Sequence, residues 1–267
     1  MIGIPHEPPI GQLRMALFVS HSDSPTGRHR HAMTPDHLLF TCEHGGHRIP
    51  RAYAHLFRGA EKVLASHHGW DLGALTVARF LSRELSQPLL AVTWSRLLVE
   101  ANRSPSNPRI WSRFTWNLPK PERQRILDRW WRPHRREVED AVAAGVAGGR
   151  RVVHVAIHSF TPELEGEVRN AEVTLLYDSR RRAEAAFCRR WAAVLCRTAP
   201  ELRLRYNYPY LGSADGLTTW LRRLHPEQRY LGIELEFNQA LVGAGGWRRF
   251  KRQLAASLRE VVAGAGA

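Results

Sequence analysis

The residues of this chain best suited to chemistry occur in the stretch TCEHGGHRIP, residues 41–50. This stretch follows a short apolar run and contains a carboxylate, two histidines and two glycines. His44 and His47 are separated by two residues, as ligands are in many zinc sites. Gly45 and Gly46 would let the backbone turn tightly around an ion. The stretch therefore predicts a metal-binding loop, with acid–base work or a simple polar turn as alternatives.

Further ionisable side chains come at or near the ends of other predicted strands. In a parallel sheet these strand ends share one side of the molecule, and sites form there. The residues concerned are His158 after the strand expected at 151–157, Arg96, Asn102 and Arg103 after the strand expected at 88–94, and Glu234 with Glu236 in the strand expected at 230–237. Because several strands show this feature, we expect one shared site.

A catalytic zinc ion takes three protein ligands and leaves one position open. His44 and His158 are the first two candidates, and the third is His47 or Asp71. Asp71 stands at the start of a helix expected at 71–85, so capping that helix is its alternative role. A lone histidine at a strand end is often only hydrogen-bonded, but the shared context favours His44 and His158 as ligands.

The remaining side chains supply acid–base and anion-binding chemistry. Glu234 and Glu236 face the same side of their strand, and one of them could act as the base toward a metal-activated water. A salt bridge to an arginine is the alternative. Arg96 could stabilise an oxyanion. Asn102 and Arg103 suit a substrate carboxylate, because a guanidinium binds it through two parallel hydrogen bonds.

The composition limits the class of protein. The 267 residues carry a formal net charge of +14, nearly all of it from arginine. Such a charge can indicate nucleic-acid binding. No zinc-finger spacing or RNA-binding signature accompanies it, so we expect a small anionic substrate instead. No apolar run is long enough for a membrane span, and only three cysteines occur, which favours the cytoplasm.

Alternating strands and helices must position these residues. Strands are expected at 38–42, 88–94, 151–157, 172–177, 202–206 and 230–237. Helices are expected at 71–85, 122–146, 180–198, 216–224 and 247–263, one or two short helices at 51–65, and a loop at 104–119. Several strands are apolar on both faces, which is typical of a parallel sheet covered on both sides. We therefore predict a three-layer α/β/α fold with a mixed, mainly parallel sheet.

The domain organisation follows from the same pass along the chain. Residues 1–36 are rich in Pro, His, Ser and Gly and lack a sustained period, which predicts a flexible N-terminal leader. No linker or internal repeat follows. Residues 37–267 are therefore expected to form a single catalytic domain.

Several segments together resemble the N-formylglutamate amidohydrolase family over roughly residues 37–262. They are TCEHGGHRIP (41–50), SHHGWDLGA (66–74), SRLLVEANRS (95–104), HSFTPELEGEVR (158–169), LLYDSRR (175–181), NYPYLGSADGLTT (207–219) and YLGIELEFNQ (230–239). Their order and spacing agree as well, so the resemblance is specific. The family is similar to zinc carboxypeptidases and aspartoacylases, which implies a carboxypeptidase-like α/β sheet with zinc at its strand ends.

The resemblance also implies residue roles. His44 and His158 take the places of the two zinc histidines, Glu234 resembles the catalytic glutamate, Arg96 the oxyanion arginine, and Asn102–Arg103 the pair that binds the substrate carboxylate. The chain departs from the pattern at two positions. His47 stands where the family usually has Asn, and Glu100 stands where the wider group has Asp.

The expected function is a zinc-dependent amidohydrolase that cleaves N-formylglutamate or a related N-acyl amino acid. One alternative keeps this chemistry and acts on another N-acyl amino acid or a peptide. Another is a basic nucleic-acid-binding protein on a degenerate hydrolase fold. Other divalent ions could occupy the same ligand set as zinc.

Overall fold

The apolar strands pair into one six-stranded sheet in the computed structural model, which describes residues 36–264. The strand order is β2 (Leu89–Ala91), β1 (His37–Cys42), β3 (Val152–Phe160), β8 (Tyr230–Asn238), β6 (Val173–Leu176) and β7 (Leu204–Tyr206). The first four strands run parallel, β6 is antiparallel to β8, and β7 is parallel to β6. The predicted mixed, mainly parallel sheet is confirmed. The predicted leader, residues 1–36, lies outside the described residues except for Asp36.

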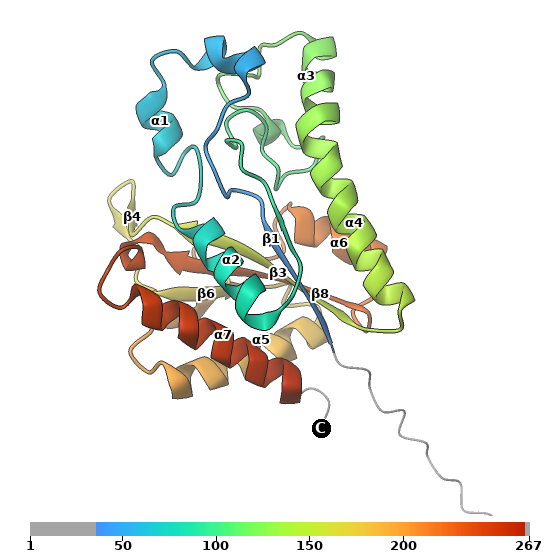
Figure 1. Cartoon of the computed structure of the whole chain (residues 1–267), viewed down its shortest axis with the longest axis vertical. Coiled ribbons are helices and arrows are strands. Elements are labelled where there is room, and N and C mark those ends of the chain that lie inside the picture. Colours follow the sequence, from blue (N-terminus) through green and yellow to red (C-terminus); the bar gives the residue numbers. More distant parts are fainter. Residues whose placement is uncertain (1–35, 265–267) are drawn as a thin grey trace, which may run out of the picture. The chain divides into compact units, whose positions relative to one another are not determined.

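Helices cover both faces of the sheet (Figure 1). The helices α2 (Ala74–Leu85), α5 (Arg182–Thr198) and α7 (Trp247–Ala263) pack on one face, and α4 (Arg132–Ala147) and α6 (Leu217–Leu224) on the other. Successive strand residues point to opposite faces, so Phe40 joins the first core and Leu39 the second. The three predicted layers are therefore present. Strand β3 is buried along its whole length, which explains why most of its residues are apolar.

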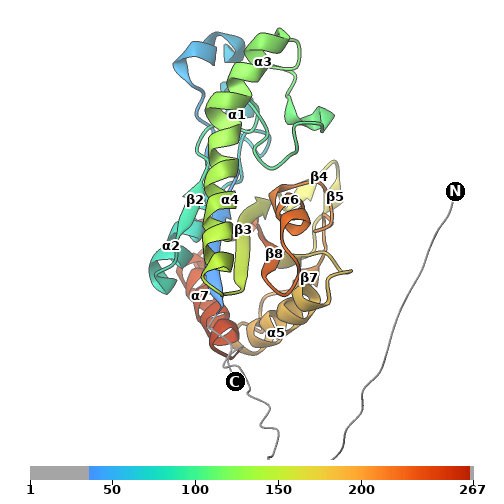
Figure 2. The same cartoon turned by 90° about the vertical axis from the view of Figure 1, so that its right-hand side faces the viewer.

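A smaller hydrophobic cluster lies beyond one end of the sheet (Figure 2). It joins the 3₁₀ helix Arg51–Phe57 and α1 (Glu61–Ala65) to α3 (Lys120–Ile126). The helix α3 continues through a π-helical turn, Leu127–Trp131, into α4, so the long helix predicted at 122–146 is continuous. Within residues 36–264, no helix is both long and apolar enough to cross a membrane.

Some boundaries differ from the sequence prediction. The strand expected at 88–94 is short, because the chain leaves β1 after Ala91 and only Trp94 forms an isolated bridge, with Arg48. The loop expected at 104–119 contains the 3₁₀ turn Pro108–Ile110. After β3, the chain forms a hairpin of β4 (Glu163–Leu164) and β5 (Glu167–Val168), which its polar sequence did not indicate.

Candidate metal centre and pocket

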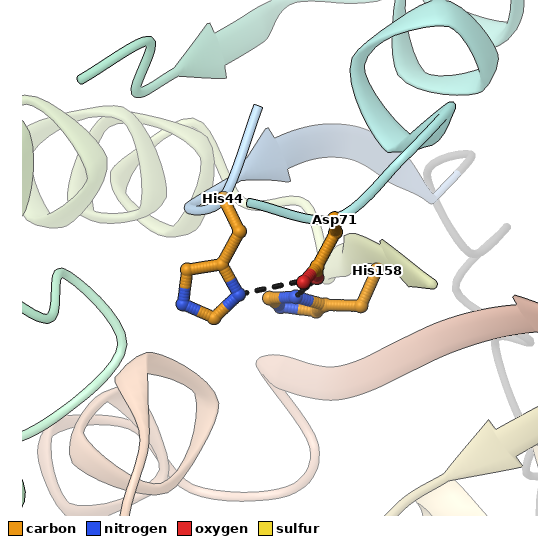
Figure 3. Close-up of side chains that lie close together, drawn as sticks. All are labelled: His44, Asp71 and His158. Carbon is orange, nitrogen blue, oxygen red and sulfur yellow. Dashed lines mark hydrogen bonds and ion pairs between the residues drawn. The ribbon is translucent and has the colours of Figure 1, made fainter. Parts of the chain in front are cut away.

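Three buried side chains meet at the carboxyl ends of the parallel strands (Figure 3). His44 follows β1, Asp71 precedes α2, and His158 lies near the end of β3. The Nδ1 atoms of His44 and His158 lie 3.1 and 2.9 Å from Asp71 Oδ2. One ligand atom from each residue lies within 4.8 Å of the other two. Two imidazole nitrogens and one carboxylate oxygen form a donor set that suits zinc.

The local sequence explains how His44 reaches this position. Strands β1 and β3 are parallel neighbours, so their ends bring His44 and His158 to the same edge. The loop after β1 passes close to the chain that follows β2, where a Cβ on Gly46 would lie 2.4 Å from Thr93 O. Glycine is thus required at position 46 because the backbone of Thr93 leaves no room for a Cβ atom. The requirement does not come from a left-handed backbone conformation, since the φ of Gly46 is not positive.

His47 does not join the cluster. Its side chain is exposed, and its ring centroid lies 5.0 Å from that of Trp70. Of the two candidates for the third ligand, the structure brings only Asp71 to His44, and the N-cap position of α2 is Gly73. Of the two residues predicted as alternative third ligands, the structure therefore places Asp71 in the cluster and His47 on the exposed surface.

The outer nitrogens of both histidines face carboxylates. His44 Nε2 lies 2.5 Å from Glu100 Oε1, and His158 Nε2 lies 3.2 Å from Glu43 Oε2. The other oxygen of Glu43 lies 3.3 Å from His134 Nε2, on α4. Such partners fix the orientation of a ligand imidazole and increase its basicity. The sequence alone did not indicate a role for Glu43 or His134; the one signal in it was a carboxylate directly beside His44.

The surroundings of the site carboxylates favour their ionised forms. Although burial alone would raise the pKa of Asp71, His44, His158 and Arg96 together hold it well below the usual range. Burial also opposes ionisation of Glu100, but Arg96 and His44 lower its pKa strongly. Asp71 and Glu100 therefore carry negative charge in these surroundings.

Arg96 is held beside the cluster by two carboxylates. Its Nε donates to Glu100 Oε2 at 2.8 Å, and one terminal nitrogen donates to Asp71 Oδ1 at 3.2 Å. Its side chain keeps 27% of its surface exposed and lines the pocket described next. A guanidinium fixed in this way can stabilise negative charge that develops on an oxygen near the cluster.

The cluster opens into a pocket of about 380 Å³, which contains most of the predicted site residues. Those present are His44, Asp71, Arg96, Asn102, Arg103, His158 and Glu234. Asn102 Oδ1 accepts a hydrogen bond from Leu217 N at 2.8 Å, so its amide nitrogen is left for a ligand. Arg103 donates to the carbonyl oxygen of Asp215 and forms no ion pair within residues 36–264. Asn102 and Arg103 therefore offer donors to an anion.

The two glutamates of β8 have different environments. Glu234 Oε1 accepts a hydrogen bond from Thr218 Oγ1 at 2.9 Å. Glu236 pairs in register with His158, is 6% exposed, and its Oε2 has no hydrogen-bond partner in the described part of the chain. Burial raises the pKa of Glu236 to about 8, and Asp71 and Glu234 add to this effect. The structure therefore places both carboxylates at the pocket, and within residues 36–264 the buried Oε2 of Glu236 has no hydrogen-bond partner.

Comparison with known proteins finds one matching family and similar solved structures. A profile of the family described as N-formylglutamate amidohydrolase matches residues 36–242. The solved gene product Atu2144 from Agrobacterium tumefaciens is 30% identical, with a TM-score of 0.68 over 86% of this chain and 93% of that chain. The N-formylglutamate amidohydrolase from Ralstonia eutropha JMP134 is 18% identical, with a TM-score of 0.61 over 86% of this chain and 95% of that chain, and shares the fold. No curated protein matches.

Proposed function

The chain belongs to the N-formylglutamate amidohydrolase family, and we propose that it hydrolyses the amide of N-formylglutamate or a related N-acyl amino acid with a bound zinc ion. The observation that carries this proposal is the buried cluster of His44, Asp71 and His158 at a pocket lined by arginines and glutamates. When bound there, the ion would supply Lewis-acid activation of water and of the amide carbonyl. The three cysteines are unpaired, which supports placement in the reducing cytoplasm.

The arginines of the pocket bind and stabilise negative charge. Arg96, held between Asp71 and Glu100, stabilises the oxyanion that forms from the amide carbonyl. Asn102 and Arg103 bind the carboxylate of the N-acyl amino acid, because their donors face the pocket and lack an anionic partner within residues 36–264. These contacts would hold the amide beside the metal cluster.

A carboxylate of β8 transfers a proton from the attacking water to the leaving amine. The sequence resemblance favoured Glu234, but the environment favours Glu236. Glu236 is paired in register with His158, and its Oε2 has no hydrogen-bond partner within residues 36–264. In contrast, one oxygen of Glu234 accepts a hydrogen bond from Thr218. Because burial raises the pKa of Glu236 to about 8, its ionised form is a stronger base than an ordinary carboxylate, and this ionised form takes a proton from the attacking water and passes it to the leaving amine nitrogen.

Metal content tests the cluster. Elemental analysis of the wild type should show about one zinc per chain, which His44→Ala and Asp71→Ala should lose. The matched control is His47→Ala, which removes an exposed histidine three residues from His44 and should keep the metal. The metal site as assigned would be wrong if the wild type took up no zinc on reconstitution, or if His47→Ala lost zinc as completely as His44→Ala.

Hydrolysis assays test the reaction and the base. We expect the wild type to release the acyl group from at least one member of a panel of N-formyl and N-acetyl amino acids and short formyl peptides. Glu236→Gln should lower kcat by about 100-fold or more, with a much smaller effect for Glu234→Gln. The reverse order of effects would return the role of base to Glu234, and no hydrolysis across the panel would refute the proposed function.

A further inference from the structure

A second cavity lies between the loop 104–108 and the helices α4 and α6, which pack on the same face of the sheet (Figure 1). Its volume is about 640 Å³. Small-molecule sites typically enclose about 300–1,000 Å³. The rings of Trp131 and Trp220 line it, and it shares only Asp215 with the pocket of the proposed reaction. The cavity therefore has the size and the aromatic surface for a small planar molecule.

Four arginines line this second cavity, and three of them have no ion pair within residues 36–264. Arg132 is paired with Asp128. The other three are Arg135, Arg136 and Arg223. Arg136 and Arg223 are exposed, and each comes from a different helix, α4 and α6. The cavity thus brings unpaired positive charges from two elements to one place.

Arg135 contributes a buried guanidinium to the wall of the second cavity. The residue is only 3% exposed, and its Nε and Nη2 donate to the carbonyl oxygens of Ala101 and Arg103 at 3.2 and 3.0 Å. Its Nη1 forms no hydrogen bond within residues 36–264, and its guanidinium carbon lies 4.9 Å from the centre of the Trp131 ring. Burial lowers the pKa of Arg135 to about 10, since the surrounding groups do not fully compensate its charge. An anion in the cavity would compensate it.

The two carboxylates that line the second cavity are bonded to neutral groups. Glu139 Oε1 accepts a hydrogen bond from Trp220 Nε1 at 2.6 Å, which orients the indole ring. Asp215 Oδ2 accepts hydrogen bonds from Ser104 N at 3.0 Å and from Asn107 Nδ2 at 2.7 Å, which hold the loop in place. Neither carboxylate forms an ion pair with an arginine in the described part of the chain. They therefore shape the cavity and leave the guanidinium groups for a ligand.

The combination of arginines and indole rings indicates the class of ligand. A phosphate monoester carries about two negative charges at neutral pH and has three terminal oxygens, so it can be bound by several guanidinium groups at once. A single carboxylate has fewer charges and oxygens to share among them. A nucleobase stacks on the face of an aromatic side chain. We propose that this cavity is a binding site for a nucleoside monophosphate, with the phosphate bound by Arg135, Arg136 and Arg223 and the base stacked on Trp220.

Calorimetric titration of the wild type with AMP, GMP, CMP and UMP tests the site. At least one of them should bind with a Kd below about 1 mM. The corresponding nucleoside and inorganic phosphate should each bind at least about 10-fold more weakly, because each lacks one of the two recognised groups. The proposal is overturned if none of the four nucleotides binds, or if inorganic phosphate alone binds as tightly as the nucleotide.

Exposed positions serve for the variants, because Arg135 also holds two backbone carbonyl groups and its replacement could disturb folding. The double variant Arg136→Gln/Arg223→Gln should raise the Kd by about 10-fold or more through loss of charge-assisted contacts. Trp220→Leu, at a residue that is 38% exposed, should raise it by about 5- to 100-fold through loss of stacking. A Kd within about 3-fold of the wild type in both variants would refute the assignment.

Matched control variants change the same residue types outside the second cavity. Arg113→Gln/Arg129→Gln removes two exposed arginines, and Trp116→Leu removes an indole that is 61% exposed. Both should bind the nucleotide as the wild type does, which separates local recognition from general attraction by positive charge. Arg169→Gln, which changes an arginine of the other pocket, should also leave the Kd unchanged. If Arg169→Gln weakened binding as much as Trp220→Leu, the nucleotide would not occupy the proposed site.

A single-stranded RNA of about ten nucleotides with the preferred base distinguishes a free nucleotide from nucleic acid. The volume of the cavity suits one nucleotide, so the strand should bind less than about 10-fold more tightly than the monophosphate. Much tighter binding of the strand that Trp220→Leu abolishes would overturn the assignment to a small molecule. The binding assays need no hydrolysis, so their outcome does not depend on the proposed function.

Discussion

Replacement of Glu100 by Gln would measure how strongly the protein supports the proposed ligand His44. Glu100 lies 2.5 Å from His44 Nε2 through one oxygen and accepts a hydrogen bond from Arg96 Nε at 2.8 Å through the other. Glutamine preserves the volume but removes the charge, so the imidazole becomes a weaker donor to the metal and Arg96 loses one of its two counter-ions. Loss of such a partner lowers metal affinity by about 10- to 100-fold, or about 1.4 to 2.7 kcal/mol.

Competition with a chromophoric chelator at neutral pH gives the metal affinity of each variant. Glu84→Gln, at an exposed position on α2, is the control and should bind zinc as the wild type does. Glu100→Asp should fall between the wild type and Glu100→Gln, because the shorter side chain withdraws its carboxylate from His44. The reasoning is refuted if Glu100→Gln folds normally and binds zinc within about 3-fold of the wild type.

Two further predictions concern stability. Tyr230→Phe removes a buried hydroxyl that lies 2.7 Å from His154 Nδ1, so urea unfolding should show a loss of about 1–3 kcal/mol, with no comparable loss for the more exposed Tyr206→Phe. The Arg180 guanidinium lowers the pKa of Asp178 from 3.8 to about 2. Ionised Asp178 therefore stabilises the folded state fully above pH 3.8, and this stabilisation is lost as the pH falls through about 2. Asp178→Asn should therefore be less stable than the wild type at neutral pH, and the difference should shrink in acid; a difference independent of pH would contradict this.

The residues that form the centre were largely visible in the sequence because strand ends are local features. The run before His44 is mostly apolar, the run containing His158 is rich in β-branched residues, and parallel neighbours bring their ends together. Glu43 and His134 were not visible as a pair, because they are 91 residues apart and meet only when α4 packs on the sheet. Contacts of this kind depend on packing between elements, and local patterns do not encode them.

The sequence by itself determined the alternation of strands and helices, the two candidate histidine ligands and the two carboxylates of β8, since side-chain period and strand ends are properties of short segments. Only the tertiary structure shows that Asp71, and not His47, lies beside His44 and His158, because this arrangement depends on how separate segments of the backbone pack together. Likewise, Glu234 and Glu236 share one face of a strand, and only the packing of the neighbouring elements gives Glu234 a partner, Thr218, while Glu236 Oε2 has none in the described part of the chain. Those long-range neighbours determine which of the ionisable side chains have oxygens or nitrogens left for a ligand.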